Sequence, residues 1–218
     1  MLSRSEENYL KTIYNLSDEG SRPVTTSELA VRMNTKPASI TDMMKKLSAK
    51  KLIDYAPYYG ANITRQGTSD ALEIIRKHRL WETFLVEKLG FQWDEVHEVA
   101  EQLEHVQSRS LIDKLDQFLG YPSADPHGQS IPDKNGHLKE LKILGLSEIR
   151  DDKHWTIRSI RSGSPALLQY LTKVGIYIGA KVQILERRPF DGSLEVSIDE
   201  KLVITISREV SENIFVGL

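Results

Sequence analysis

The stretch TSELAVRMNTKPASITDMMKKLSAKKLIDYAPYYGANIT, residues 26–64, decides the fold of the N-terminal part of the chain. Hydroxyl residues at its start can cap a short helix that extends to Met33. Residues 34–37 form a tight connection, and Pro37 suits the first turn of the next helix because its missing N–H costs nothing there. We expect that second helix from Ala38 to about Lys50, with four apolar residues facing inward: Ile40, Met43, Met44 and Leu47.

Two short β runs follow the second helix, at residues 52–55 and 61–64, and the turn APYYG separates them. This arrangement predicts a β-hairpin. Before the quoted stretch, Leu10, Ile13 and Tyr14 have the spacing of a helix that packs one face inward. A helix, a helix–turn–helix and a hairpin, in this order, predict a winged helix–turn–helix, which is a DNA-binding fold.

Further along the chain, the pattern predicts helices at residues 65–89, 93–109 and 110–118. A connector rich in Pro and Gly follows at residues 121–136. Beyond about residue 140, four short and mostly alternating runs predict a small β barrel. The expected fold class is therefore mainly α with small β elements. We expect a winged helix–turn–helix at 1–74, a helical domain at 75–140, a linker at 141–153 and the barrel at 154–218.

Composition narrows the functional classes. The chain has 218 residues, 39% hydrophobic and 28% charged, as in soluble globular proteins. No run approaches the ~18 apolar residues of a membrane helix, and the first residues lack the apolar region of a signal peptide. We therefore expect a cytoplasmic protein without a membrane partner. The absence of cysteine excludes disulfides, thiol catalysis, iron–sulfur clusters and cysteine-ligated zinc.

Charge is unevenly distributed along the chain. The overall net charge is −2, but residues 1–77 carry +3, residues 78–141 carry −6 and residues 142–218 carry +1. Five of the six histidines lie in the acidic middle segment. Carboxylates and imidazoles together suit a divalent cation, although they also describe an ordinary acidic surface. The basic front and the acidic middle indicate different partners.

The strongest candidate site is Glu101, Glu104 and His105, whose i, i+3 and i+4 spacing puts them on one side of a helix. His97 lies four residues before Glu101, and His78 and Glu82 form a second i, i+4 pair. Two such helices can enclose a metal ion, and the alternative is a solvated acidic face with core histidines. A shell of oxygen and imidazole without thiolate favours Mn²⁺ or Fe²⁺.

The candidate DNA-reading helix carries residues that suit base edges and phosphates. Base edges would be met by the N-terminal part of the helix, where Ser and Thr hydrogen-bond several bases and Asp accepts from cytosine. Lysines further along and residues of the hairpin would meet phosphates. The alternative is a solvated lysine face. The candidates are Lys36, Ala38, Ser39, Thr41, Asp42, Lys45, Lys46, Tyr58 and Arg65.

Taken together, these segments resemble the diphtheria toxin repressor family of metal-dependent bacterial repressors, which includes the manganese transport regulators. The stretches that carry the resemblance are YLKTIY at residues 9–14, the helix–turn–helix with its hairpin, RKHRL at 76–80 and VHEVAEQLEHV at 96–106. The C-terminal part, with GIYIGA at 175–180, resembles the SH3-like domain of the longer members. The resemblance implies a homodimer, joined by helices from about 65 to 120, that binds palindromic operator DNA.

The resemblance also implies a ligand set. Glu101, Glu104 and His105 match the effector-site ligands, and Glu at position 101 is typical of the manganese branch, whereas the iron branch has Cys. His78, Glu82 and His97 match further ligands. Asp125 and His127 match a Cys-x-His pair of a second site, with a loop turn as the alternative. The implied ion is Mn²⁺, with Fe²⁺ as the alternative and with Zn²⁺, Co²⁺ or Cd²⁺ as substitutes in vitro.

Two departures from the family pattern concern the first helix. Manganese regulators usually have an aspartate where this chain has Asn8, and the short ones have a glutamate where it has Lys11. We expect Asn8 to complete a site with Glu101, Glu104 and His105, and the division of the other ligands between sites stays open. Metal would cancel the repulsion between Glu101 and Glu104, recruit Asn8 and fix the spacing of two recognition helices at about 34–36 Å or a multiple.

Two other functional classes remain open at this stage. A metallohydrolase on the central helix would need an H-E-x-x-H or H-x-x-E-H motif, and the chain has neither. Alternatively, the protein is a winged-helix regulator that senses no metal and whose barrel binds a peptide or a small molecule. We favour a metal-dependent repressor of metal-ion homeostasis, not an enzyme.

Overall fold

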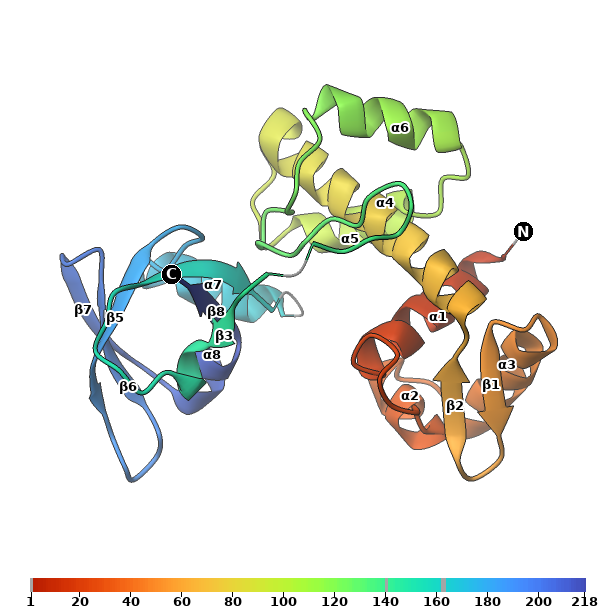
Figure 1. The fold of residues 1–218 in the computed structure, drawn as a ribbon, viewed down its shortest axis with the longest axis horizontal. Coiled ribbons are helices and arrows are strands. Elements are labelled where there is room, and N and C mark those ends of the chain that lie inside the picture. Colours follow the sequence, from red (N-terminus) through yellow and green to blue (C-terminus); the bar gives the residue numbers. More distant parts are fainter. Residues whose placement is uncertain (1, 140, 162–163) are drawn as a thin grey trace. The chain divides into compact units, whose positions relative to one another are not determined.

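The computed structural model describes residues 2–139, 141–161 and 164–218 (Figure 1). Their contacts divide the chain into two units. Within the described residues, the first unit comprises Met1–His78, Leu103–Ser108 and Pro132–His137. The second comprises Arg79–Gln102, Arg109–Ile131 and Leu138–Leu218. Each unit is described by itself below.

The first unit begins with three helices that contact one another: α1 (Arg4–Leu16), α2 (Thr26–Arg32) and α3 (Pro37–Ala49). Capping boxes start α1 and α2, in which a hydroxyl accepts from a backbone N–H and a glutamate three residues later bonds back. Pro37 occupies the first turn of α3, as predicted. The apolar faces of the helices meet in a core that includes the fully buried Leu10, Ile13, Leu29, Ile40 and Met44.

A two-stranded hairpin follows the three helices in the first unit. Strand β1 (Ile53–Ala56) pairs antiparallel with β2 (Gly60–Ile63), and Val24 forms an isolated bridge to Ala61. Tyr58 lies fully exposed in the turn between the strands. Three helices followed by this hairpin confirm the winged helix–turn–helix.

Helix α4 (Arg65–Leu89) has the predicted bounds and supplies residues to both units. In the second unit, α6 (Arg109–Phe118) packs on α4 through Leu80, Ile112 and Leu115. The predicted helix at 93–109 is wrong in extent, because α5 covers only Val96–Leu103. Turn hydrogen bonds flank it, from Glu95 N–H to the Gln92 carbonyl and from Val106 N–H to the Leu103 carbonyl.

The C-terminal part of the second unit is a six-stranded antiparallel sheet in the order β3-β8-β4-β5-β6-β7 around one apolar core. The predicted runs form β4 (Trp155–Ile160), β5 (Lys181–Arg187), β6 (Leu194–Ile198) and β7 (Leu202–Ile206). A short helix, α7 (Pro165–Lys173), lies between β4 and β5 in the chain. Elements beyond the prediction are β3 (Leu144–Gly145), the 3₁₀ turn η1 (Leu146–Glu148), α8 (Arg208–Glu212) and β8 (Ile214–Gly217).

The expected fold class is thus confirmed, with helical N-terminal and middle parts and a small C-terminal β domain. Within the described residues, no helix combines the length and the apolar character required to cross a bilayer.

Gly60 provides a test of how the hairpin is held. Its φ is +91°, and a Cβ there would lie 2.6 Å from the carbonyl oxygen of Val24, whereas Gly90 has a φ of +75° with open space around it. We expect Gly60→Ala to lower the free energy of unfolding by about 1–3 kcal/mol, more than Gly90→Ala, because only Gly60 adds a clash to the backbone strain. Urea unfolding of both variants measures this. Equal losses would contradict it.

Candidate metal centres and nucleic-acid interface

The first candidate centre, called the central cluster, comprises Glu7, Lys11, His78, Glu104 and His105, all in the first unit. Glu104 is fully buried, and Lys11 Nζ donates to its Oε1 at 2.7 Å and to its Oε2 at 2.8 Å. His78 Nδ1 lies 2.6 Å from Glu104 Oε2. Burial raises the pKa of Glu104, but His78 and the Lys11 ammonium outweigh this effect, and the pKa lies below its usual value.

A second contact of α1 holds His105. Glu7 Oε2 lies 2.5 Å from His105 Nδ1, and Gln107 Nε2 donates to Glu7 Oε1 at 2.9 Å. His105 Nε2 remains on the Glu104 side of the ring, 3.9 Å from Glu104 Oε1. A carboxylate that holds one ring nitrogen of a histidine while the other faces a site is the usual arrangement around histidine metal ligands.

The ligands predicted from the sequence include Asn8 but not its neighbour Glu7. Asn8 is exposed on α1, whereas Glu7 is buried. Spacing alone does not single out Glu7, because Glu7 and Asn8 lie four and three residues before Lys11 and both spacings put a residue on the same side of the helix. Asn8 stays a prediction as a ligand, and Glu7 is the neighbour that the fold brings against His105.

Glu101 also differs from the expectation. Because α5 ends at Leu103, Glu104 and His105 lie in the turn after the helix, so the three residues do not share one helical face. The Glu101 side chain is 50% exposed and lies 3.5 Å from His97 Nε2. The charge of Glu104, which was expected to repel Glu101, is already compensated by Lys11 and His78.

The second candidate centre, called the connector cluster, comprises the buried residues Glu82, Asp125 and His127 of the second unit. Each offers a ligand atom, and these atoms lie within 4.8 Å of one another. His127 Nδ1 is 3.5 Å from Glu82 Oε2 and 3.9 Å from Asp125 Oδ1. His97 borders the cluster, with Nδ1 3.3 Å from Glu82 Oε1.

Two atoms of the connector cluster are buried without a hydrogen-bond partner among the described residues, namely Asp125 Oδ2 and His127 Nδ1. Both residues are fixed through their other atoms. Asp125 Oδ1 accepts from the backbone N–H groups of His127 and Gln129, at 2.8 and 3.0 Å. His127 Nε2 lies 2.8 Å from the Trp93 carbonyl, which can only accept, so Nε2 carries a hydrogen and Nδ1 faces the carboxylates of Glu82 and Asp125.

The electrostatics of the connector cluster also favour a cation. Burial and then the charge of Glu82 raise the pKa of Asp125 to about 6. Hydrogen bonds to Glu101 and then to Glu82 raise the pKa of His97 to about 9. The charge of Glu82 contributes to both shifts, and a divalent ion between the carboxylates would offset it. The donor set of two carboxylates and one imidazole therefore fits a divalent metal ion.

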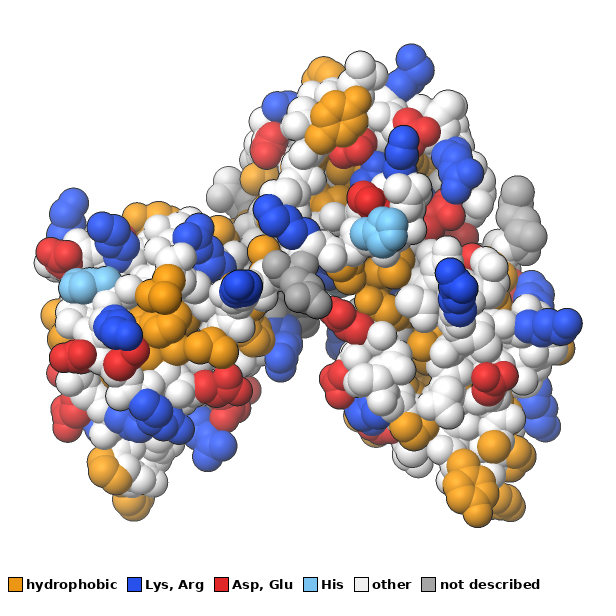
Figure 2. All heavy atoms as spheres, viewed as in Figure 1, with side chains coloured by type: hydrophobic (Ala, Val, Ile, Leu, Met, Phe, Trp, Pro, Cys, Tyr) orange, Lys and Arg blue, Asp and Glu red, His pale blue; other side chains and the backbone are white. Residues whose placement is uncertain are grey.

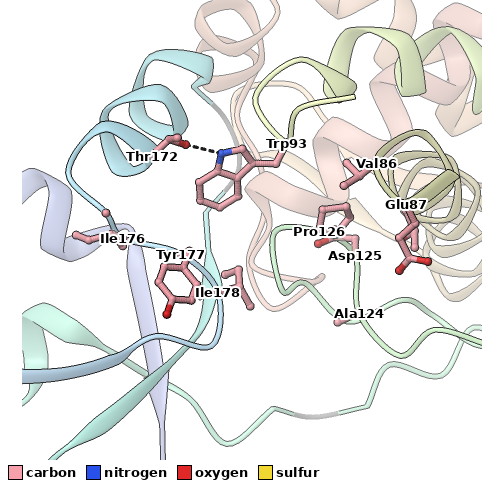
Figure 3. A pocket seen from close by; sticks show the side chains of 12 residues that line it. Val86, Glu87, Trp93, Ala124, Asp125, Pro126, Thr172, Ile176, Tyr177 and Ile178 are labelled. Atoms are coloured by element: carbon pink, nitrogen blue, oxygen red, sulfur yellow. Dashed lines mark hydrogen bonds between the residues drawn. The ribbon is translucent and has the colours of Figure 1, made fainter. Parts of the chain in front are cut away.

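Trp93 links the connector cluster to the β domain within the second unit. Its indole Nε1 donates to Thr172 Oγ1 of α7 at 2.8 Å, and its ring stacks on His127 with centroids 6.1 Å apart. Figure 3 shows the indole pointing toward Thr172. Trp93, Pro126 and Tyr177 line a cavity of about 550 Å³. The β domain thereby helps to fix the carbonyl that orients His127.

The predicted DNA-reading residues lie at the start of α3 and on the hairpin. Lys36 is the N-cap of α3, and Ala38, Ser39, Asp42 and Lys45 are exposed. Figure 2 shows Lys and Arg side chains along the edge of this unit where Figure 1 labels α3. Tyr58 and Arg65 are exposed as well. This surface presents the residue types that a recognition helix needs.

Two of these candidates have partners inside the unit. Thr41 Oγ1 donates to the Pro37 carbonyl at 3.0 Å. Lys46 Nζ lies 3.4 Å from Glu6 Oε1, and Lys50 Nζ lies 2.6 Å from the same atom. Burial raises the pKa of Glu6, but Lys50 and Ser3 outweigh it and hold the pKa at about 2. Lys46 therefore contributes to the packing of α3 against α1 as well as to the basic surface.

The Trp93–Thr172 hydrogen bond can be measured by a double-mutant cycle. We expect Trp93→Phe and Thr172→Val to show a coupling of about 0.5–1.5 kcal/mol in unfolding free energy, because either change alone removes the bond. The exposed Thr205 is the matched control, and Trp93→Phe with Thr205→Val should be additive. Additivity of Trp93→Phe with Thr172→Val would contradict the link.

Comparisons with known proteins bear on all three parts of the chain. Residues 1–61 match the model of the iron-dependent repressor N-terminal DNA-binding domain, and residues 64–133 match that of the metal-binding and dimerisation domain. Residues 144–218 match the FeoA domain. The iron-dependent repressor IdeR of Mycobacterium tuberculosis is 33% identical over 160 residues, which cover 73% of this chain and 67% of IdeR.

Solved structures agree over nearly the whole length. A manganese-dependent transcriptional repressor in complex with manganese superposes with a TM-score of 0.90 at 33% identity, over 97% of this chain and 98% of that one. ScaR with bound Cd²⁺ superposes with a TM-score of 0.84 at 34% identity and the same coverage. The chain therefore belongs to the diphtheria toxin repressor family of metal-dependent transcriptional repressors.

Proposed function

We propose that this chain is a metal-activated repressor of metal-ion homeostasis genes, and that it binds a palindromic operator as a homodimer when a divalent cation fills the connector cluster. The single observation that carries this proposal is the connector cluster, in which Asp125 Oδ2 and His127 Nδ1 are buried beside Glu82 without hydrogen-bond partners among the described residues. Burying such atoms is costly, and a metal ion satisfies both at once.

The ion that we propose is Mn²⁺, with Fe²⁺ as the alternative. Carboxylate oxygens and an imidazole without thiolate suit Mn²⁺, and aspartate at position 125 adds a hard oxygen donor. Raw affinity would favour Zn²⁺ or Cu²⁺, so selectivity depends on geometry and on metal supply. The similarity to repressors described with manganese, cadmium and zinc agrees with a site that accepts several divalent ions in vitro.

Within each unit, the chain's own residues perform the positioning. Trp93 orients His127, and the backbone N–H groups of His127 and Gln129 orient Asp125. In the first unit, Glu7 and Lys11 hold α1 of the DNA-binding part against Glu104 and His105. A bound ion supplies positive charge to the carboxylates. It shifts the protein toward the DNA-binding arrangement only by its differential affinity for that arrangement.

DNA recognition is proposed for α3 and the hairpin. Lys36, Ser39 and Asp42 would meet base edges, and Lys45, Tyr58 and Arg65 would meet the backbone. In a homodimer two copies of α3 would enter major grooves about 34–36 Å apart or a multiple of it, so the operator would be a palindrome. We assign the clusters to regulation in the cytoplasm, not to catalysis, because the chain has no H-E-x-x-H or H-x-x-E-H pair.

The experiment that tests this function is selection from a randomised duplex DNA pool with Mn²⁺, with Fe²⁺ under anaerobic conditions, and with a chelator. We expect one palindrome to be enriched only in the metal lanes. Its enrichment in the chelator lane would replace this proposal with a regulator that senses no metal. No enrichment in any lane would contradict the DNA-binding function.

Asp125→Asn tests the role of the connector cluster on the selected operator. We expect this variant to lose at least about tenfold in Mn²⁺ affinity, since it removes a buried anionic ligand, and to require correspondingly more Mn²⁺ for half-maximal operator binding. Asp152→Asn, at an exposed position, makes the same charge change and should behave as the wild type. Equal Mn²⁺ affinities for the two variants would contradict a metal site at the connector cluster.

Lys45→Ala tests the recognition surface separately. Lys45 is exposed on α3 in the first unit, whereas the connector cluster lies in the second. We expect weaker operator binding with a smaller dependence on salt concentration, because one phosphate contact is lost, and unchanged Mn²⁺ affinity. Fluorescence anisotropy at several salt concentrations measures it. If operator affinity depended on salt concentration as in the wild type, Lys45 would not contact a phosphate.

A further inference from the structure

The Lys11 ammonium occupies the place on Glu104 that a bound cation would take. It lies 2.7 and 2.8 Å from the two carboxylate oxygens, so both oxygens of the fully buried Glu104 are engaged. The Lys11 side chain is itself only 12% exposed. His78 contributes a further contact at 2.6 Å to Oε2. Among the described residues, Glu104 therefore offers a metal ion no oxygen that is not already used.

In the connector cluster, the nearby cationic side chain, Arg79, does not occupy the carboxylate in this way. Arg79 Nε approaches Asp125 Oδ2 only to 3.6 Å, beyond hydrogen-bond distance. The guanidinium instead donates to the Ser130 carbonyl and to Gln129 Oε1. Asp125 Oδ2 consequently keeps its lone pairs for an added ion. The central cluster is thus neutralised from within, whereas Asp125 of the connector cluster keeps an oxygen available to an added ion.

We propose that Lys11 is a resident cation of the central cluster, which a divalent ion must displace from Glu104 before it can bind there. This inference rests on the proposed function. It implies an order of filling, with the connector cluster taking the first ion and the central cluster a second and weaker one. Lys11 thereby sets the metal concentration at which the central cluster responds.

The geometry allows this exchange without release of α1. Lys11 reaches Glu104 through a flexible four-carbon stem and lies one turn from Glu7 on the same helix. When the ammonium swings away, the contacts of Glu7 with His105 and Gln107 still hold the helix. The ion and the ammonium then compete for one carboxylate while the surrounding fold stays in place.

The test isolates the central cluster in the full-length protein. With Asp125→Asn weakening the connector cluster, Mn²⁺ binding is measured by electron paramagnetic resonance of the free ion and by calorimetry. We expect Lys11→Met in this background to bind Mn²⁺ at least about tenfold more tightly than Asp125→Asn alone, because the competing charge is gone. Lys11→Arg keeps the charge and should leave the affinity low.

Two further variants serve as controls for this experiment. Lys45→Met in the same background makes an equal change of net charge on exposed α3, and it should not alter Mn²⁺ affinity. Lys11→Gln keeps a donor for buried Glu104, so it serves where Lys11→Met fails to fold. We also expect the Lys11 variants to unfold at lower temperature without metal and to gain more from added Mn²⁺ than the Asp125→Asn parent.

The outcomes separate this inference from the proposed function. Unchanged or weaker Mn²⁺ binding in both Lys11→Met and Lys11→Gln would overturn the role of Lys11 while the proposed metal-activated repressor stands. Tighter binding in Lys45→Met as well would show a general charge effect and would also overturn it. Absence of Mn²⁺ binding by the wild type would instead contradict the proposed function itself.

Discussion

Buried carboxylates that need positive charge are the constraint on which both clusters depend. An isolated ionised carboxylate in a protein interior is so costly that it must be paired, protonated or bound to a metal. Glu104 meets this requirement inside the chain, through Lys11 and His78. Glu82 is paired with His97 and lies 3.5 Å from His127, whereas Asp125 meets this requirement only in part, because Arg79 Nε stays 3.6 Å from its Oδ2. The difference in compensation, more than the difference in ligand type, distinguishes the two clusters.

The same charged contacts join segments that are distant in sequence. Lys11 and Glu104 are 93 residues apart, and Glu7 and His105 are 98 apart, yet both pairs connect α1 with the turn after α5. In the second unit, Trp93 bonds through its carbonyl to His127 and through its indole to Thr172. In the first unit, polar side chains thus connect the central cluster to α1 of the DNA-binding part. In the second unit, Trp93 connects the connector cluster to the β domain.

Local sequence patterns were sufficient to predict the elements whose ends depend on nearby residues alone. The bounds of α4 and the order of elements in the winged helix–turn–helix follow from apolar spacing, Pro37 and the hairpin turn, and the structure confirms them. The extent of α5 was wrong because turns at both ends, invisible in its apolar spacing, limit it to Val96–Leu103. Strand β8 escaped prediction because it has only four residues and its identity depends on pairing with β3 and β4, which are distant in sequence.

The candidate sites also depend on turns and on contacts between distant segments, which local sequence patterns do not contain. The spacing of Glu101, Glu104 and His105 implies one face only if the helix continues, and it ends at Leu103. Choosing Glu7 over Asn8 requires the rotation of α1 against a distant turn, which spacing along one helix does not contain. For Asp125 and His127, the sequence left two alternatives, a loop turn and a pair of metal ligands. The structure shows that the two are compatible.

Asp125 Oδ1 holds the turn through two backbone N–H groups, and this leaves Oδ2 aimed at the site. The turn is therefore the means by which the ligand is positioned.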